Sequence, residues 1–252
     1  MVEQRNLQQE VEQLRQDNMA IRALLTNRTS TDTDAKLNRD CKDIYLNGQT
    51  QSGVYKINPL DNEILVDVYC DMVTEGGGWT AIQKRRSGSV RFNRTWAEYR
   101  NGFGNPKDSY WIGNDVIHKL TKGINPSLYV SITLQNDTNL YEIYNKFSIS
   151  DEASLYLLFL GGPAIGTLGD SMLYTNYFRA VLSGMSFSTP DRDNDRWSGS
   201  CAATWRGGWW FNHCHYAFLN GPWYPEDWTF VWHPTLYDNS NVKDTLMMIK
   251  RH

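Results

Sequence analysis

Residues 187–203 read FSTPDRDNDRWSGSCAA, and this stretch guides the interpretation of the whole chain. Its Asp, Asn, Ser and Gly residues favour turns. Short polar side chains form hydrogen bonds with the nearby backbone, and glycine adopts backbone conformations that a side chain would hinder. The stretch also opens the part of the chain richest in tryptophan, since seven of the ten tryptophans lie between Trp197 and Trp232. Such a composition predicts long, ordered loops rather than regular sheet.

Residues 191–199 have the sequence DRDNDRWSG, with carboxylates at alternating positions. Ca²⁺ takes about six to eight oxygen ligands, and carboxylates spaced in this way can converge on one ion from a curved loop. An EF-hand is excluded, because its sixth residue must be glycine and its twelfth glutamate, whereas this segment has Arg196 and Ala202 there. The pattern indicates either another kind of calcium loop or a solvated acidic turn.

The four cysteines are Cys41, Cys70, Cys201 and Cys214, and none of their spacings is the C-x-x-C of a zinc or redox motif. Four cysteines allow three disulfide connectivities, of which two local loops, 29 and 13 residues apart, are the most economical. Disulfides form in oxidising compartments. The cysteine pattern therefore favours an extracellular setting.

Three N-glycosylation sequons, at Asn27, Asn93 and Asn136, also indicate secretion. The first 25 residues are polar and charged and contain no apolar segment of the kind found in signal peptides. Because the cysteines and sequons favour export, we expect a fragment, or a secreted chain whose leader is missing. The expected location is extracellular.

The overall composition excludes two classes of protein. The net charge is −3 and the pI about 6.0, so the basic footprint of a nucleic-acid-binding protein is absent. Mean hydropathy is −0.55, and the longest apolar run, residues 155–160, is cut by Gly161 and is far shorter than a membrane span. We expect neither a nucleic-acid partner nor a membrane span.

Residues 1–29 are rich in Glu, Gln, Arg and Leu and contain no Gly or Pro. Their apolar residues follow a heptad spacing, which predicts a coiled-coil stalk and hence a homo-oligomer. The alternative is a lone amphipathic helix packed on its own globe. Residues 30–38 are polar and are predicted to be a linker. The seam residues are Leu7, Val11, Leu14, Asn18, Ile21 and Leu25, of which the Asn would fix the register.

The rest of the chain carries many short motifs in a fixed order. Strands are expected at residues 65–69 and 128–134 and a helix at residues 96–99. The motifs are GGGWT (76–80), QKRR (83–86), FNRTW (92–96), YRNGFG (99–104), WIGND (111–115), GTLGDS (166–171), FSTPDRDND (187–195), CAA (201–203), GWWF (208–211), CH (214–215) and LNG (219–221). Together with both cysteine pairs, they resemble the fibrinogen C-terminal domain family.

The resemblance implies an α+β globe, a fibrinogen C-terminal domain, over residues 39–252 with three subdomains. The first is small and closed by a Cys41–Cys70 disulfide. The second holds a central mixed β-sheet. The third is loop-rich, contains Cys201 and Cys214, and carries the binding sites.

The resemblance also implies that the acidic segment binds Ca²⁺. The side chains of Asp193 and Asp195 are the expected ligands, together with the backbone carbonyls of Trp197 and Gly199 and some water molecules. Calcium is thus the expected cofactor.

Lectin-like members of the family bind acetyl groups in a neighbouring pocket, and there the peptide bond before the second cysteine is cis. That bond corresponds here to the bond between His213 and Cys214. Trp205 stands where such members often carry Tyr, and residues 222–228 form a shorter stretch than their loop. By resemblance, the pocket residues are Trp205, Phe211, His213, Cys214, His215 and Trp228.

Two classes of binding function fit these features, and catalysis does not. His213 and His215 bracket a possible nucleophile, but a disulfide-bonded Cys214 has no thiolate, so no enzyme is expected. We expect a secreted, calcium-binding, lectin-like recognition protein that binds acetylated glycans in innate defence. The alternative is a signalling or matrix ligand of the angiopoietin or tenascin type, whose globe engages a cell-surface receptor.

Overall fold

The computed structural model describes residues 13–14, 16–17, 20, 38–59, 65–173, 181–223, 231–238 and 240–252. The described residues before residue 38 are helical, and Gln13 Nε2 donates to Asp17 Oδ1 over one turn at 3.1 Å. Most of the expected stalk and linker lies outside the described residues, so the coiled coil stays a prediction. No helix in the described part of the chain is long and apolar enough to cross a membrane.

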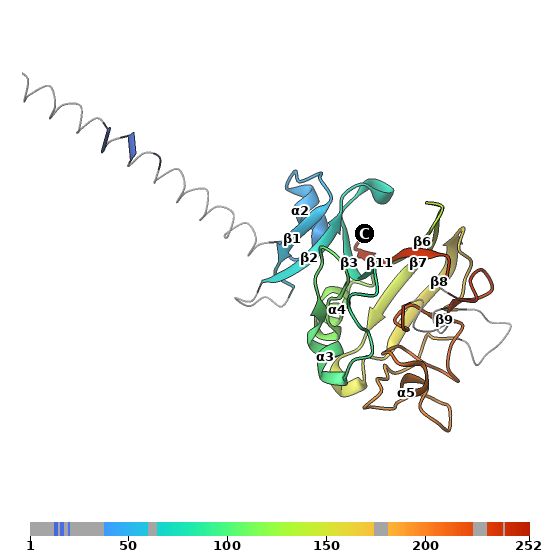
Figure 1. Cartoon of the computed structure of the whole chain (residues 1–252). Helices are drawn as coiled ribbons and strands as arrows, with labels where there is room; N and C mark the ends of the chain where they lie inside the picture. Colours follow the sequence, from blue (N-terminus) through green and yellow to red (C-terminus); the bar gives the residue numbers. More distant parts are fainter. Residues whose placement is uncertain are drawn as a thin grey trace, which may run out of the picture.

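A nine-stranded sheet forms the centre of the globe (Figure 1). The last strand, β11, lies between β3 and β6, and the short β4 and β5 extend from β3. The main path is β1 (Gly53–Ile57), β2 (Val66–Asp71), β3 (Trp79–Arg85), β11 (Val242–Lys250), β6 (Ser127–Leu134), β7 (Asn139–Ile149) and β8 (Leu158–Gly166), with β4 (Phe103–Gly104) and β5 (Tyr110–Trp111) beside it. β2 and β6 confirm the strands predicted at residues 65–69 and 128–134.

The sheet is antiparallel, which corrects the expectation of a mixed sheet. Every strand pair in its described part is antiparallel. Because β3 and β6 are each antiparallel to β11, they point the same way, but β11 separates them. On one side of β11, β1, β2 and β3 are consecutive along the chain, and on the other side β6, β7 and β8 are consecutive. No two parallel strands are therefore neighbours among the described residues.

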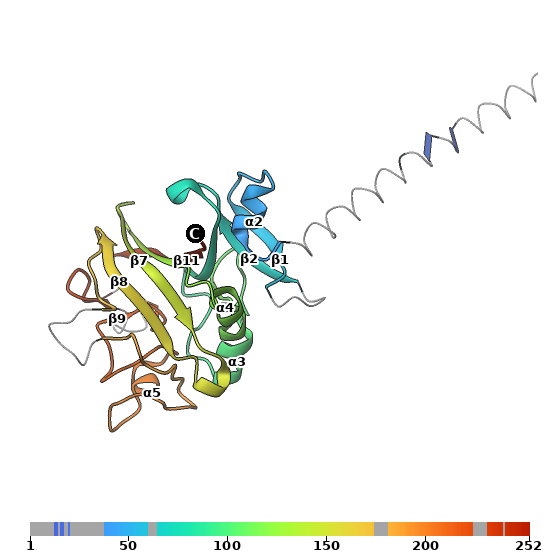
Figure 2. The same cartoon turned by 180° about the vertical axis from the view of Figure 1, so that it is seen from behind.

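Short helices pack at one end of the sheet. α3 (Trp96–Asn101) begins with a capping box, in which the Glu98 N–H donates to Thr95 Oγ1 at 3.3 Å and the Thr95 N–H donates to Glu98 Oε2 at 2.9 Å. This helix confirms the prediction for residues 96–99. α4 (Asn114–Thr121) packs against α3 and β7 (Figure 2).

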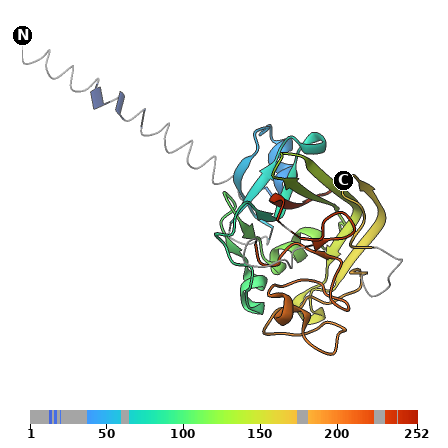
Figure 3. The same ribbon diagram turned by 45° about the vertical axis from the view of Figure 1, so that its right-hand side comes forward.

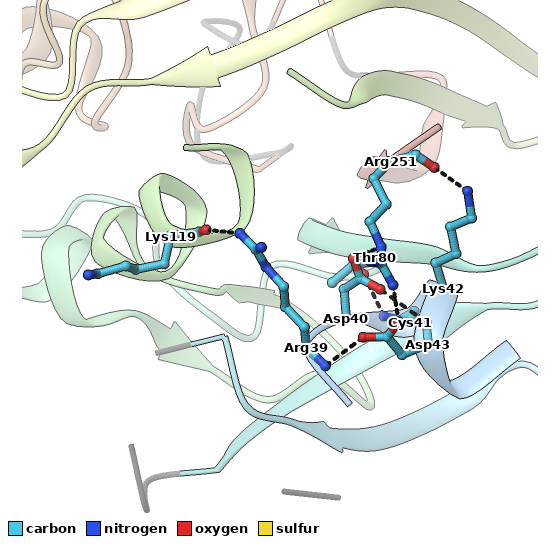
Figure 4. Close-up of polar contacts among 8 residues, drawn as sticks. All are labelled: Arg39, Asp40, Cys41, Lys42, Asp43, Thr80, Lys119 and Arg251. Atoms are coloured by element: carbon cyan, nitrogen blue, oxygen red, sulfur yellow. Dashed lines mark hydrogen bonds and ion pairs between the residues drawn. The ribbon is translucent and has the colours of Figure 1, made fainter. Parts of the chain in front are cut away.

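The first helix of the globe, α2 (Cys41–Leu46), is fastened to distant parts of the chain (Figure 4). Its Cys41–Cys70 disulfide, predicted from the resemblance, joins it to β2. Three hydrogen bonds extend these ties to β3, α4 and the end of the chain. They are Arg39 Nη2 to the Lys119 carbonyl (2.7 Å), the Cys41 N–H to Thr80 Oγ1 (3.0 Å) and Lys42 Nζ to the Arg251 carbonyl (2.9 Å).

Aromatic rings form the core where the C-terminal loops meet the sheet. Trp111, Phe187 and Trp210 are fully buried, and the ring centroids of Phe187 and Trp210 lie 5.1 Å apart. Trp210 Nε1 donates to the Tyr156 carbonyl at 2.9 Å. Because such rings bury large apolar areas, they hold the loops in place with little regular structure. The loop-rich part contains only α5 (Cys201–Trp205) and the pair β9 (Ala217–Phe218) and β10 (Val231–Trp232) among its described helices and strands.

Candidate functional site

The predicted calcium loop lies at the end of the globe far from α2 (Figures 1 and 3), and backbone bonds hold its base. Ser188 and Trp209 exchange two of these bonds, at 2.9 and 3.0 Å, and Thr189 and Arg192 exchange two more at 2.9 Å. The Asn194 N–H then donates to Ser188 Oγ at 3.0 Å. The loop therefore has a fixed base, although its own backbone is irregular.

Asp191 binds the scaffold. Its Oδ1 accepts the backbone N–H of Trp96 at 2.9 Å and the Thr189 hydroxyl at 2.7 Å. Trp96 is the first residue of α3, and a helix N-terminus favours negative charge. Asp191 thus joins the loop to a helix, which leaves Asp193 and Asp195 as the two loop aspartates available for an ion.

Asp193 and Asp195 interact through the loop backbone. Asp193 Oδ1 accepts the Asp195 N–H at 3.1 Å, and Asp195 accepts the N–H groups of Trp197 and Cys201, both at 2.8 Å. Burial raises the pKa of Asp195 to about 6, and Asp193 adds to the rise, while the two backbone N–H bonds oppose it. The negative charges of this pair therefore repel each other in a partly buried place, an arrangement that a bound cation would relieve.

Trp197 and Gly199, the predicted carbonyl ligands, pack on each other. A Cβ added at Gly199 would lie only 3.0 Å from Trp197 Cζ3. A side chain at residue 199 would therefore displace the indole ring. Glycine at this position lets the loop close under Trp197.

The donor set of the loop suits Ca²⁺, which prefers carboxylate and carbonyl oxygens. Among the described residues, no group of three or more His, Cys, Asp or Glu side chains comes together as a metal site. A cation held by Asp193 and Asp195 would therefore need carbonyl oxygens and water to complete its coordination, as Ca²⁺ allows.

The predicted disulfide between Cys201 and Cys214 is present, with Cα atoms 5.3 Å apart. On one side of it, Ser200 caps α5, its hydroxyl accepting the Ala203 N–H at 3.1 Å. On the other side, Cys214 has a φ of 63°, a left-handed conformation that is uncommon outside glycine. The Asn212 N–H donates to the Cys214 carbonyl at 3.0 Å and closes this turn.

The peptide bond between His213 and Cys214 is trans, which corrects the expectation of a cis bond. The cis bonds of the described residues precede Pro163 and Pro234. The positive φ of Cys214 reverses the chain at this point, so the turn forms without a cis bond.

Three predicted pocket residues form one aromatic cluster. The ring centroids of Trp205 and His215 are 5.3 Å apart, and those of Phe211 and His215 are 5.6 Å apart. Trp205 and His215 are half-buried, whereas Phe211 is fully buried. Phe211 therefore supports His215 from the core, and the predicted role of its ring as a ligand-facing wall does not fit its burial.

Two nitrogen atoms of this cluster are enclosed and make no hydrogen bond: Trp205 Nε1 and His215 Nδ1. Leaving a buried polar atom unpaired costs about 1–3 kcal/mol. Burial lowers the pKa of His215 to about 3, with a smaller contribution from His233, so its imidazole is neutral at physiological pH. The residue as a whole is only partly buried, but its Nδ1 is enclosed.

The remaining predicted site residues lie outside the aromatic cluster or outside the described residues. His213 is exposed on the turn before Cys214. Asn93 and Asn136 are also exposed, so their side chains are accessible, and their glycosylation stays a prediction. Trp228 and Asn27 lie outside the described residues.

Sequence reasoning missed Arg85, the last residue of β3, whose side chain borders a cavity of about 410 Å³ although the residue is only 1% exposed. The only signal was the QKRR run at residues 83–86. Since arginine is almost never fully buried without a partner, nothing in that run predicts a buried guanidinium.

Comparisons with known proteins agree with one another. The family model for the C-terminal globular domain of fibrinogen beta and gamma chains matches residues 37–251. Human fibroleukin is 38% identical over 227 residues, which cover 84% of this chain and 51% of fibroleukin, so the chain spans about half the length of that relative.

Two solved structures share the fold. The fibrinogen-like globe domain of human ANGPTL6 has a TM-score of 0.77 at 33% identity, covering 85% of this chain and 96% of that one. The lamprey fibrin D-dimer, in complex with the peptide ligand Gly-His-Arg-Pro-amide, has a TM-score of 0.74 at 31% identity and covers 97% of this chain and 87% of its own.

Proposed function

The chain belongs to the fibrinogen C-terminal globular domain family, and on this premise we propose that it is an extracellular, calcium-dependent binding protein with a lectin-like preference for acetylated glycans. Fibrinogen-like domain proteins are not enzymes, and Cys214, bonded to Cys201, has no thiolate to act as a nucleophile. The two disulfides support the extracellular location, because such bonds persist in oxidising compartments.

The unpartnered nitrogens of Trp205 and His215 carry the proposal. An indole N–H can only donate, whereas Nδ1 of a neutral imidazole accepts in one of its tautomers. An acetamido group offers one carbonyl acceptor, one N–H donor and a small methyl group, so it complements both nitrogens and the rings around them. Both side chains are half-buried but both nitrogens are enclosed, so ligand binding would require each ring to rotate until its nitrogen reaches the surface.

Calcium would act on this site through the backbone, without touching the sugar. The side chains of Asp193 and Asp195 and the carbonyls of residues 197 and 199 would hold the ion. Asp195 also accepts the N–H of Cys201, where α5 begins. An ion that binds only the folded loop stabilises it. It would therefore steady α5 and the segment closed by the disulfide, which carry Trp205 and His215.

A peptide or protein partner is the second candidate function. A peptide bond presents the same N–H and carbonyl groups as an acetamido group, so the two nitrogens alone do not separate the candidates. The lamprey fibrin D-dimer, which matches most of this chain, was solved with a peptide ligand. On this alternative the globe engages a cell-surface receptor or matrix protein.

The proposal includes a homo-oligomer built on residues 1–29. Several weak sites on one stalk bind a surface of repeated ligands much more tightly than one site does. That property suits recognition of microbial glycans in innate defence. Sedimentation tests it: the whole chain should be oligomeric and residues 38–252 monomeric, and a monomeric whole chain at micromolar concentration removes the stalk from the proposal.

Binding to beads that carry N-acetylglucosamine separates the two candidates. The protein in calcium should bind, and chelator or free N-acetylglucosamine, but not glucosamine, should release it. Trp205→Phe keeps an aromatic ring and removes the indole N–H, so binding should weaken roughly 5- to 100-fold, in line with one lost hydrogen bond. Trp209→Phe is the control, because Trp209 Nε1 is also unpartnered but its residue is fully buried.

The two outcomes are distinct. If the folded, calcium-loaded protein ignores the beads and binds Gly-His-Arg-Pro-amide or a receptor ectodomain, the peptide alternative holds. If Trp205→Phe and Trp209→Phe weaken bead binding equally, the aromatic cluster is not the site.

A further inference from the structure

The cavity beside Arg85 is separate from the site described above. Its volume, about 410 Å³, lies within the range of roughly 300–1,000 Å³ that is typical of small-molecule sites. Its described lining comes from the end of β3, from Gly88 and residues 90–93, and from Arg206, Pro222 and Trp223. None of these residues belongs to the calcium loop or to the Trp205–His215 cluster.

Arg85 lies at the inner side of this cavity, with its guanidinium packed among rings and carbonyls. The guanidinium carbon is 4.3 Å from the ring centroid of Phe92 and 5.0 Å from that of Trp223. Nη1 donates to the carbonyl of Leu219 at 3.0 Å and to that of Gly221. Nε is enclosed, like Nδ1 of His215, and donates to no atom. The Nε edge is therefore the part of the guanidinium that the fold leaves unpaired.

No carboxylate of the described residues forms an ion pair with Arg85. Burial lowers the pKa of Arg85 to about 9, so the group still carries its charge at neutral pH. Two exposed arginines, Arg91 and Arg206, line the same cavity, and no described lining residue is acidic. A buried cation without a counter-ion is costly, and carbonyl dipoles compensate only part of its charge.

We propose that this cavity binds a small oxyanion, a carboxylate or sulfate group that is either free or carried by a ligand whose body packs against Trp223. Guanidinium groups bind such anions through two parallel N–H···O bonds, and the edge formed by Nε and Nη2 is one that makes this fork. The exposed rim arginine Arg91 raises the local concentration of anions. The cavity has room for a group about the size of one sugar ring.

Two sources offer this chemistry, an acidic sugar and a free inorganic anion, and one titration distinguishes them. The folded, calcium-loaded protein with Asn93→Gln is used, because Asn93 lines the cavity and carries a sequon. The probes are sodium sulfate, methyl glucuronide and its neutral counterpart methyl glucoside, at constant ionic strength. The measurement is the shift of the Arg85 Nε–H and Trp223 indole N–H signals in ¹H–¹⁵N NMR spectra.

We expect sulfate and methyl glucuronide to shift both signals with saturation in the millimolar range, and methyl glucoside to shift neither. A response to sulfate alone supports the anion site and assigns it to a free inorganic anion. The absence of saturable shifts with both anions, or equal responses to the glucuronide and the glucoside, overturns the proposal. N-acetylglucosamine should leave both signals unchanged, so the acetamido site and this site succeed or fail independently.

Two variants test the residue assignment. Arg85→Lys keeps the charge but loses the fork, and it should weaken anion binding at least tenfold, as followed by the Trp223 signal. Arg86→Gln removes a neighbouring exposed charge that does not line the cavity, and it should change the affinity less than twofold. An equal loss in both variants would indicate general electrostatic attraction and refute the site.

Gly88→Leu tests the site without touching the buried guanidinium, in case Arg85→Lys does not fold. A Cβ at Gly88 would lie 3.5 Å from Trp223 Cδ1, an ordinary contact, and Gly88 lines the cavity, so the leucine side chain should occupy part of it. This variant should fold normally and lose the anion-induced shift of the Arg85 Nε–H signal. Unchanged binding in Gly88→Leu contradicts the proposal.

Discussion

Arg251 Nε lies 2.9 Å from Asp40 Oδ2, so the penultimate residue of the chain is ion-paired with the N-cap of α2. The distance is that of an ion pair, although the Nε–H is not aligned for a hydrogen bond. Arg251 also pairs with Asp43 in the first turn of the helix (Figure 4). Burial raises the pKa of Asp40, and Arg251 is the main group that opposes this rise.

Arg251→Ala should lower the free energy of unfolding by about 1–3 kcal/mol, because it leaves a mostly buried carboxylate without its partner. Chemical denaturation monitored by tryptophan fluorescence measures this change. Lys56→Ala is the matched control, since its ion pair with Asp67 has the same type of charges at 3.0 Å but both side chains are more than half exposed. Such surface pairs contribute about 0–1 kcal/mol. Equal losses in the two variants would contradict the structural role of Arg251.

The loop aspartates should differ in their response to calcium. Asp195→Asn should abolish the rise in Tm that calcium produces in the unmutated protein, because Asp195 is proposed as a ligand. Asp191→Asn should lower Tm by a few degrees both with calcium and with chelator, since Asp191 binds Trp96 at the start of α3. Differential scanning calorimetry in both conditions gives the two shifts. A calcium effect that survives in Asp195→Asn moves the ion to another site.

Without calcium, Asp195 should make stability depend on pH. Its carboxyl has a pKa of about 4 in the unfolded chain and about 6 in the folded one, so the folded state holds the proton more tightly. Its stabilising contribution is therefore complete below about pH 4 and is lost as the pH rises through 6. In chelator, the difference in Tm between the unmutated protein and Asp195→Asn should fall over this window, and a flat difference contradicts it.

His215 should not titrate between pH 5 and 8, because burial holds its pKa near 3. The ¹H–¹⁵N NMR signals of its ring should stay constant over this range, while those of a free histidine move around pH 6.5. Any loss of acetamide binding in His215→Ala should accordingly be the same at pH 5.5 and 7.5. A midpoint near 6.5 for the His215 signals would show that Nδ1 is open to water.

Some features could be predicted because the residues that determine them are close together in the chain. The capping box of α3 lies within four residues, from Thr95 to Glu98, so the helix at residues 96–99 is evident from the sequence. The two disulfides likewise join cysteines that lie only 29 and 13 residues apart, in the pairing that the family resemblance implies. The tryptophan-rich composition similarly predicts irregular, ordered loops, and Trp210 shows how burial holds them.

Other features depend on segments that only the fold brings together. Asp191 belongs to an acidic run, but its carboxylate accepts the backbone N–H of Trp96, which lies 95 residues earlier in the chain. The pKa of His215 depends on the packing around its ring, and Arg85 is buried by carbonyls that lie more than 130 residues further on. The antiparallel sheet depends on β11, the last strand along the chain, which pairs with both β3 and β6 and so joins the two halves of the sheet.

The ties around α2 determine how the globe can be attached to a support. α2 and the C-terminus lie toward one end of the globe, while α5 and the predicted calcium loop lie at the opposite end (Figures 1 and 3). A tether attached just before α2 or at the C-terminus therefore leaves the end of the globe that carries α5 pointing away from the support. If several copies were joined through their N-terminal segments, the α5 end of each globe would face away from the junction. A fusion partner placed after residue 252 would then lie on the side of the junction, away from α5.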